Sequence, residues 1–366
     1  MQRILFIVPA MPDYAPYVEN YLSLAKACAV PYDVFCWNRK GESVSLPAHY
    51  HVYQHPTDDT FPAWRKLVEI SGFCRFVRKE AEKASYSSVV VFTVQNALFF
   101  RRWLVRHFPG RFVLDVRDYS PILGVGFFRK RWASLLRHAA LRVISSAGFK
   151  RWLPGDVQYV ICHNIALPDE GDQLPAVPGF TGRKVPVKLL TIGALRDAKE
   201  NIRLIDALRS EKQVALRFVG EGHATPILQD YCRREGLNQV SFSGRYKKAE
   251  EDAYVRDCDM MNLLMSDNIT SNSLMSNRFY LAARFCKPIL ASAGSYQAEL
   301  VKQYGLGLVV SASDEVAAAI LSYWDAFDPE ALQAGYVRFL EDVYQDMMVF
   351  KKSVQSLFLT ETVYKK

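Results

Sequence analysis

The strongest constraint on the fold is a regular alternation of short apolar runs with segments of helical hydrophobic spacing over residues 187–310. Each apolar run has the length of a strand, and Gly or a charged residue stands where it passes into a helical segment. Strands that alternate with helices in this way form a parallel sheet covered by helices. Residues 3–163 show the same alternation, so the sequence predicts an α/β protein with two Rossmann-like parallel-sheet domains.

Conspicuous polar residues follow the predicted strands of the second half. Arg196, Lys199, Glu221, Asn277 and Arg278 all lie at or near strand ends. Ligands of parallel α/β sheets bind beyond the carboxyl ends of the strands. We therefore expect a ligand site at this edge of the second sheet.

The first half has polar residues in equivalent places. Gln95 and Asn96 follow the strand predicted over residues 88–94, and Arg117 and Asp118 end the strand predicted over 111–118. These four residues are candidates for contacts with a second substrate. The alternative for Arg117 and Asp118 is a buried Asp–Arg ion pair that supports the fold only.

The length of 366 residues and a Pro- and Gly-rich stretch indicate two domains. Pro and Gly at high density mark an interdomain linker. We predict a first domain over residues 1–166, a linker over 167–187 and a second domain over 188–339, with one or two long helices over 328–359. The linker residues that carry this prediction are Pro168, Gly171, Pro175, Pro178, Gly179, Gly182 and Pro186.

Composition limits the class of protein. Hydrophobic residues make up 50% of the chain and charged residues 23%, which is typical of a globular protein. The seven cysteines are scattered without a CxxC pair, which indicates reduced thiols and a cytoplasmic protein. The apolar start at residues 4–10 is too short for a signal peptide and is predicted to be a strand, and no run reaches the roughly 20 apolar residues of a membrane span.

Positive charge is concentrated in residues 101–151, where twelve Lys or Arg residues accompany only two acids. Aromatic residues are interleaved with this charge across residues 99–152. Cations and aromatic rings together favour a peripheral contact with an anionic membrane, in which each Lys or Arg contributes about 1 kcal/mol. The alternative is that the rings face the core and the cations face solvent. Nucleic-acid binding is not expected, because no binding module is present.

Six short motifs follow one another in the second half: G-x-L-R-x-x-K at residues 193–199, V-G-E-G at 219–222, F-S-G at 242–244, S-N-R-F-Y at 276–280, K-P-I at 287–289 and G-L-G-L at 305–308. Their order and spacing resemble the donor-binding half of GT-B glycosyltransferases, close to the family 4 group of bacterial surface and capsular polysaccharide synthesis. The resemblance covers most of residues 141–311. It implies two Rossmann-like domains facing across a cleft, with the acceptor on the first, the nucleotide sugar on the second, and a C-terminal helix over residues 340–366 that packs back on the first.

The resemblance also implies roles for individual residues. Sugar transfer from a nucleoside diphosphate builds negative charge on the leaving phosphate, so the site must hold donors and cations there in advance. Arg196 and Lys199 correspond to the pair that grips the donor diphosphate, and we add Asp118 of the first domain as a third catalytic candidate. The expected donor-binding residues are Gly193, Gly220, Gly222, Tyr246, Ser276, Asn277, Arg278 and Glu299.

The chain departs from the family pattern at two positions. Many retaining members carry two glutamates separated by seven residues, of which one holds the donor ribose and the other contacts the sugar. Ser273 and Leu281 occupy these positions here. The ribose and sugar contacts must therefore differ from the family pattern, whereas the diphosphate grip is unaffected.

The sequence shows no Asp-x-Asp motif, no metal-ligand spacing, no P-loop and no nucleophile elbow. We expect a cytoplasmic, metal- and cofactor-independent glycosyltransferase (EC 2.4 class) that moves a hexosyl or other glycosyl group. Its donor is expected to be a UDP-sugar, with retention, and its acceptor a glycan or lipid-linked oligosaccharide at the inner membrane face. Two alternatives remain: a non-catalytic nucleotide-binding partner in a glycan-assembly complex, and a GT-B-like sugar-nucleotide epimerase.

Overall fold

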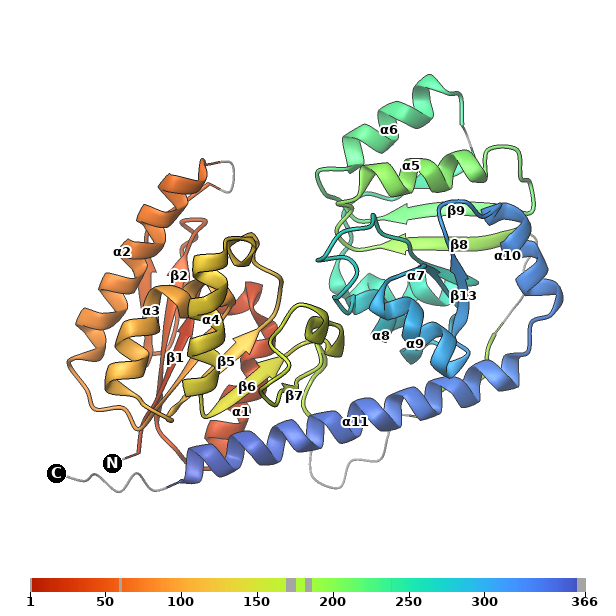
Figure 1. The fold of residues 1–366 in the computed structure, drawn as a ribbon. Helices are drawn as coiled ribbons and strands as arrows, with labels where there is room; N and C mark the ends of the chain where they lie inside the picture. Colours follow the sequence, from red (N-terminus) through yellow and green to blue (C-terminus); the bar gives the residue numbers. More distant parts are fainter. Residues whose placement is uncertain (1, 59–60, 169–175, 182–185, 238, 361–366) are drawn as a thin grey trace. The chain divides into compact units, whose positions relative to one another are not determined.

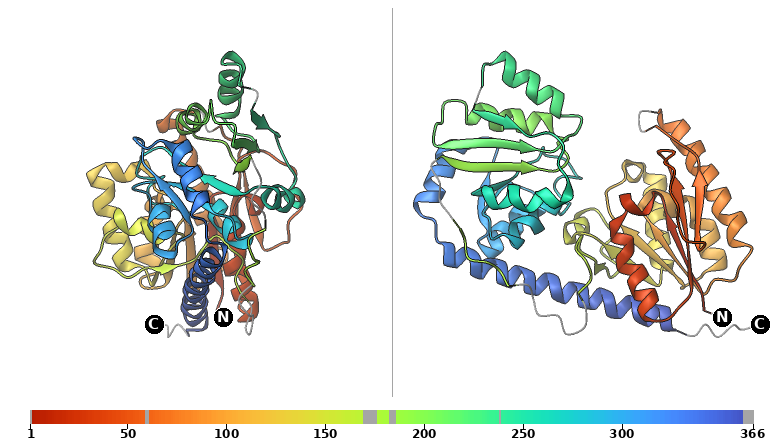
Figure 2. Two further views of the ribbon diagram at one scale, coloured as in Figure 1. Left: turned by 90° about the vertical axis from the view of Figure 1, so that its right-hand side faces the viewer. Right: turned by 180° about the vertical axis from the view of Figure 1, so that it is seen from behind.

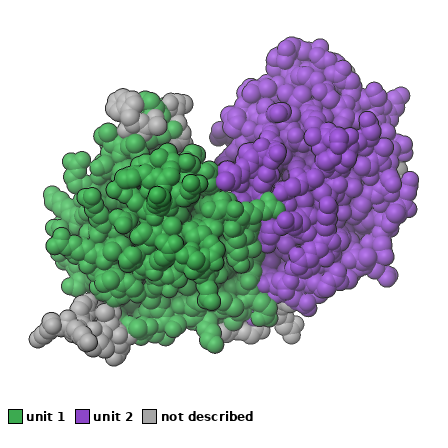
Figure 3. Space-filling model, in the orientation of Figure 1, with its two compact units in different colours: residues 1–170, 345–366 green, residues 171–344 purple. Residues whose placement is uncertain are grey.

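The computed structural model describes residues 2–58, 61–168, 176–181, 186–237 and 239–360. The chain divides into two compact units (Figure 3). Unit 1 contains residues 1–170 and 345–366, and unit 2 contains residues 171–344. Most of the predicted linker, residues 169–175 and 182–185, lies outside the described residues.

Unit 1 is built on a seven-stranded parallel sheet of order β3-β2-β1-β4-β5-β6-β7 (Figure 1). Its central strands are buried along their whole length and mostly apolar, as strands covered on both faces are expected to be. Helices α2, α3 and α4 lie on one face, and α1 packs on the other. The strands are β1 (Ile4–Val8), β2 (Tyr32–Asn38), β3 (Tyr50–Gln54), β4 (Ser88–Phe92), β5 (Phe112–Val116), β6 (Leu141–Ile144) and β7 (Val160–Ile161). The α-helices are α1 (Glu19–Ala27), α2 (Ala63–Ala81), α3 (Val94–His107) and α4 (Gly126–His138).

Unit 2 is built on a six-stranded parallel sheet of order β10-β9-β8-β11-β12-β13. Helices α5, α6 and α10 cover one face, and α7, α8 and α9 lie on the other (Figures 1 and 2). The predicted α/β class with two parallel sheets is thus confirmed. The strands are β8 (Val187–Ile192), β9 (Val214–Val219), β10 (Val240–Phe242), β11 (Met260–Leu263), β12 (Ile289–Ser292) and β13 (Gly307–Val310). The helices are α5 (Ala198–Ala207), α6 (Thr225–Arg234), α7 (Glu251–Asp257), α8 (Asn277–Arg284), α9 (Tyr296–Tyr304) and α10 (Val316–Asp325).

The last helix, α11 (Pro329–Leu359), contributes to the core of each unit. In unit 2, Phe339 packs on Phe279 with ring centroids 5.0 Å apart. In unit 1, Phe350 packs edge-on against Tyr21 of α1, and Phe358 against Phe6 of β1. One continuous 31-residue helix therefore belongs to both units.

Candidate functional site

A cavity of about 720 Å³ lies in unit 2 beyond the carboxyl ends of β8 and β9. The neighbouring strands β8, β9 and β10 each end close to a glycine with positive φ: Gly193 (+98°), Gly220 (+113°) and Gly244 (+66°). This is the sheet edge at which parallel α/β folds bind their ligands. The lining residues are Gly193, Ala194, Gly220, Glu221, Gly222, Thr225, Pro226, Gln229, Arg245 and Tyr246.

Two of the lining glycines are required by close backbone packing. A Cβ atom on Gly220 would lie 2.1 Å from the Gly193 carbonyl oxygen, and one on Gly222 would lie 2.1 Å from that of Leu195. At Gly193, by contrast, a Cβ atom would meet nothing within 4 Å. Gly220 and Gly222 therefore hold the ends of β8 and β9 together, whereas Gly193 borders open space.

Arg278, in the first turn of α8, is held against the strand ends by carbonyl groups. Its Nε donates to the Ile192 carbonyl (2.6 Å) and its Nη2 to that of Ala194 (3.2 Å), a cavity-lining residue. A longer contact joins Nη1 to the Asn262 carbonyl (3.4 Å). No carboxylate among the described residues forms an ion pair with it. The guanidinium is thus held on the carbonyl of a cavity-lining residue, with no carboxylate to neutralise its charge and two of its five N–H groups left to donate.

Burial lowers the pKa of Arg278 to about 10. Tyr246 acts to raise this pKa, and the positive charge of Arg196 acts to lower it. Arg278 remains charged at neutral pH. Of the residues that act on Arg278, Tyr246 lines the cavity. Arg196 and Arg278 are not themselves in the cavity lining, and their role as ligands of the donor stays a prediction.

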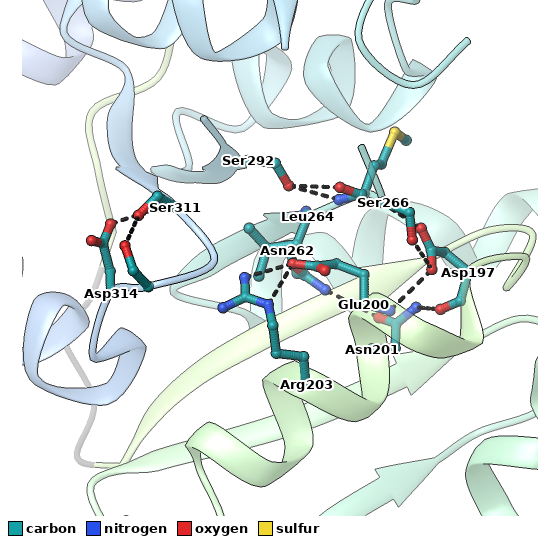
Figure 4. Close-up of polar contacts among 12 residues, drawn as sticks. Asp197, Glu200, Asn201, Arg203, Asn262, Leu264, Ser266, Ser292, Ser311 and Asp314 are labelled. Carbon is teal, nitrogen blue, oxygen red and sulfur yellow. Dashed lines mark hydrogen bonds and ion pairs between the residues drawn. The ribbon is translucent and has the colours of Figure 1, made fainter. Parts of the chain in front are cut away.

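Arg196 and Lys199 flank the residue that caps α5. Asp197 accepts from the backbone N–H of Glu200 (3.0 Å) and from the backbone and side chain of Ser266 (2.6 and 2.8 Å), as Figure 4 shows. A carboxylate with three such partners is committed to the turn. Arg196 and Lys199 are exposed, and within the described part of the chain neither forms an ion pair.

A buried polar network around Asn262 of β11 lies next to the β8–α5 turn. The Asn262 amide donates to the Thr191 hydroxyl (2.8 Å) and its carbonyl accepts from the Leu264 backbone (3.0 Å; Figure 4). Sequence reasoning missed Asn262 and Asp197. An Asn inside the apolar run M-M-N-L-L was the available signal, because a buried amide must find partners.

Tyr246 and the pair Glu221–Arg245 complete the cavity wall. The Tyr246 hydroxyl donates to Glu251 (3.0 Å), and burial, with the charge of Glu251, raises the pKa of Tyr246 to about 12. The Nε of Arg245 donates to Glu221 Oε2 (2.6 Å). Tyr246 thus lines the cavity, and its contact with a donor stays a prediction.

Like Arg278, the remaining expected donor residues lie outside the lining of the cavity. Ser276 caps α8, its hydroxyl accepting from the Arg278 backbone (3.3 Å). Asn277 is exposed at the start of α8, and Glu299 is exposed in the first turn of α9. None of these residues, nor Lys199, is in the cavity lining, so their contacts with the donor stay predictions.

The two positions where the family has glutamates cannot supply a carboxylate. Ser273 is buried, and its hydroxyl donates to the Ile269 carbonyl (2.6 Å). Leu281 lies half-buried in α8. Among the lining residues described above, Glu221 alone carries a carboxylate.

In unit 1, the buried ion pair forms between Arg117 and Asp115. Two guanidinium nitrogens of Arg117 contact the Asp115 carboxylate (2.5 and 2.6 Å), and a third contacts the Cys162 carbonyl and Asn164 (both 3.1 Å). Burial opposes the charge of Arg117, but Asp115 outweighs it and raises the pKa of the guanidinium above its ordinary value. This geometry favours the structural role for Arg117. Asp118 is exposed beyond the strand end.

Gln95 and Asn96 lie in the first turn of α3. Asn96 is buried, and its amide is 3.3 Å from the Phe92 carbonyl, whereas Gln95 is half-buried. Asn96 therefore supports the β4–α3 turn. Gln95 and Asp118 remain the accessible candidates in this unit.

The aromatic residues of the basic segment mostly face inward. Phe100, Phe108, Trp132 and Phe149 are buried, and others are partly covered. Phe127 is the exception at 54% exposed. The core interpretation thus explains most of these rings, and an exposed apolar tip remains at the start of α4.

Within the described ranges, no three His, Cys, Asp or Glu side chains are grouped so that they could hold a metal ion. The helices of the same ranges include none that is both long and apolar enough to cross a bilayer.

Neither a protein-family model nor a curated protein matches the sequence. Solved structures do match over nearly the whole chain. The lipopolysaccharide outer core galactosyltransferase WaaB aligns at 14% identity and TM-score 0.62, covering 97% of this chain and 99% of its own. Anabaena HepE in complex with UDP aligns at 16% identity and TM-score 0.64, covering 97% of this chain and 100% of its own. Sucrose-phosphate synthase from Thermosynechococcus elongatus aligns at 14% and 0.64, covering 98% and 95%. The chain therefore has the GT-B fold of these glycosyltransferases.

Proposed function

We propose that this protein is a glycosyltransferase that moves a sugar from a nucleotide sugar to a glycan or lipid-linked acceptor. The observation that carries the proposal is the Arg278 guanidinium, which is held on the carbonyl of the cavity-lining Ala194 and has no carboxylate partner among the described residues. Arg196, exposed and likewise without an ion pair to a described residue, follows Leu195, whose backbone N–H donates to the carbonyl of the lining residue Glu221 (3.3 Å). At about 4 Å and an effective dielectric constant near 20, one cation–phosphate pair contributes roughly 4 kcal/mol before desolvation. The anion that such a site fits is the diphosphate of the donor.

The two arginines have different tasks in this proposal. Arg278 is fixed by strand-end carbonyl groups before any ligand arrives, so little reorganisation is needed when charge develops on the leaving diphosphate. Arg196 is exposed on the β8–α5 turn and would bind the leaving diphosphate from the solvent side. Lys199, also exposed, is assigned the same role. We assign no metal to the reaction, because these cations serve the leaving group.

The finer features of the proposal follow the resemblance. UDP-sugars are the expected donors, in keeping with the UDP and UDP-glucose named for HepE. Retention of configuration is expected, with the leaving phosphate assisting the acceptor hydroxyl. Lipopolysaccharide or capsular polysaccharide assembly is the proposed pathway.

A non-catalytic role is the second candidate, favoured by the absence of an acid at Ser273 and Leu281. Such a protein would bind the nucleotide sugar but would not break its glycosidic bond. Release of nucleoside diphosphate from a panel of UDP- and GDP-sugars, with and without lipid-linked acceptor extract, separates the two. No release above the uncatalysed rate, despite binding, would favour the second candidate.

Nucleotide binding is the first test. A nucleoside diphosphate at about 100 times its dissociation constant should stabilise the fold by roughly 2.7 kcal/mol, measured as a rise in Tm. UDP, GDP, CDP and ADP should be compared with their nucleosides, which lack the diphosphate and should give little shift. Equal shifts for nucleoside and diphosphate would contradict a site built on Arg196 and Arg278.

We also propose a peripheral contact with the inner membrane face through the start of α4. Val125 (53% exposed) and Phe127 (54%) protrude beside the exposed Arg129 and Lys130, and the Arg131 guanidinium lies 3.6 Å from the Phe127 ring centroid. Apolar tips enter the interface while cations bind anionic head groups.

Replacing both Arg129 and Lys130 by Gln should weaken binding to vesicles with phosphatidylglycerol by about 10-fold or more, at about 1 kcal/mol for each cation. Vesicle co-sedimentation measures the change, and the exposed cations Arg233 and Arg234 of α6 offer a control pair for the same substitutions. Equal effects of the two pairs would show that net charge, rather than this tip, is what the vesicles attract.

A further inference from the structure

We infer that Glu221 binds the ribose hydroxyls of the donor, taking over a contact for which the family pattern supplies a glutamate elsewhere. The inference rests on the proposed nucleotide-sugar site and deepens it. It starts from the observation that Glu221 alone contributes a carboxylate to the described lining of the cavity.

The position of Glu221 in the topology suits this task. β8, the first strand of unit 2, leads through the Gly193 turn into α5, and β9 pairs directly with β8. In dinucleotide-binding sheets of this topology, the acid that binds a ribose hydroxyl lies about 20 residues after the glycine turn. Glu221 follows the end of β9, 28 positions after Gly193, and its backbone is anchored there by the Leu195 N–H (3.3 Å).

Glu221 also has unused hydrogen-bonding capacity. A carboxylate offers about four acceptor sites. Arg245 Nε occupies one of them on Oε2, at 2.6 Å, and no described residue donates to Oε1. The side chain of Glu221 is 45% exposed and that of Arg245 is 87% exposed, so an ion pair of this kind contributes little to stability. The Glu221 carboxylate therefore keeps room for two hydroxyl donors beside Arg245.

Other nearby acids are committed elsewhere. Asp197 caps α5, and Glu200 pairs with Arg203 at 2.5 Å. Glu251 accepts from the Tyr246 hydroxyl and pairs with a lysine. Of the carboxylates at this edge of the sheet, Glu221 is the one that faces the cavity with acceptors free.

The test is a double-mutant-type thermodynamic cycle, in which the ribose hydroxyl of the ligand and the carboxylate of the protein are removed singly and together. Affinities for UDP and 2′-deoxy-UDP are measured by calorimetry with the wild type and with Glu221→Ala, and the same is done with GDP and 2′-deoxy-GDP. The wild type should bind at least one ribonucleotide about 10-fold more tightly than its deoxy counterpart, because a site built for a hydroxyl is left with an unpaired acceptor. Glu221→Ala should bring that ratio to within about twofold, a coupling that only contacting groups show.

Glu235→Ala is the matched control, since Glu235 forms a similar exposed ion pair with Arg209 (2.7 Å) outside the lining of the cavity. It should keep the wild-type ratio. Equal affinity of the wild type for ribo and deoxy ligands overturns the inference but leaves the diphosphate site intact. If the Glu221→Ala variant kept the wild-type preference for the ribonucleotide over its deoxy counterpart, another residue would bind the ribose. No affinity for any nucleoside diphosphate overturns the proposed function together with the inference.

Discussion

Replacing Arg196 by Ala is expected to lower kcat at saturating donor by about 100-fold or more, the scale for losing one preorganised donor to a developing negative charge. Arg196 is exposed on the β8–α5 turn and forms no ion pair with a described residue, so its removal should leave the fold intact. Arg278 is the poorer probe, because its guanidinium also ties β8 to α8. Release of nucleoside diphosphate from the nucleotide sugar that gives the highest rate measures the effect.

The control is Arg233→Ala, which removes another exposed cation of unit 2, from α6. It should change turnover by less than twofold and leave Tm within about 2 °C, the usual range for surface substitutions. If Arg196→Ala and Arg233→Ala had the same turnover, Arg196 would have no part in the reaction.

Replacing Arg117 by Met is expected to destabilise the protein by about 3–5 kcal/mol, the cost of leaving a buried charge without its partner. Asp115 is 1% exposed, and after the substitution it keeps the Tyr21 hydroxyl (2.6 Å) but loses both guanidinium contacts. Unfolding of the full chain in urea, followed at a tyrosine- or tryptophan-sensitive wavelength, measures the loss.

Arg137→Met provides the comparison, because Arg137 pairs with Asp156 at 2.8 Å on the surface of the same unit. Exposed pairs of this kind contribute about 0.2–1 kcal/mol. Similar losses for the two variants would mean that the Arg117–Asp115 pair is not the anchor of β5 that its burial indicates.

The architecture was predictable from the sequence because it depends on local periodicity. Apolar runs such as residues 88–92 and 187–192 became buried parallel strands, and the charged amphipathic stretch after residue 62 became α2. β7, at the edge of the sheet, has two residues and pairs with β6 only. The C-terminal segment forms one helix despite Gly335, whose missing Cβ allows contact with the Tyr304 carbonyl.

The site was predictable only in part. Strand-end position predicted Gly193, Gly220 and Tyr246, which line the cavity, and Arg196, which does not. The hydrogen bonds that hold Arg278 were not predictable, because its carbonyl partners belong to residues 192, 194 and 262 and meet it only in the tertiary fold. The pairing of Arg117 with Asp115 could have been inferred, since residues two apart on a strand share a face.

The account depends most on the claim that a diphosphate binds between the guanidinium groups of Arg196 and Arg278. A crystal structure of the protein soaked with UDP or GDP tests this claim directly. We predict phosphate oxygens within hydrogen-bonding distance of both groups, with the nucleoside in the cavity beside Tyr246. Both side chains turned away from the nucleotide, or a nucleotide bound elsewhere while the cavity stays empty, would contradict it.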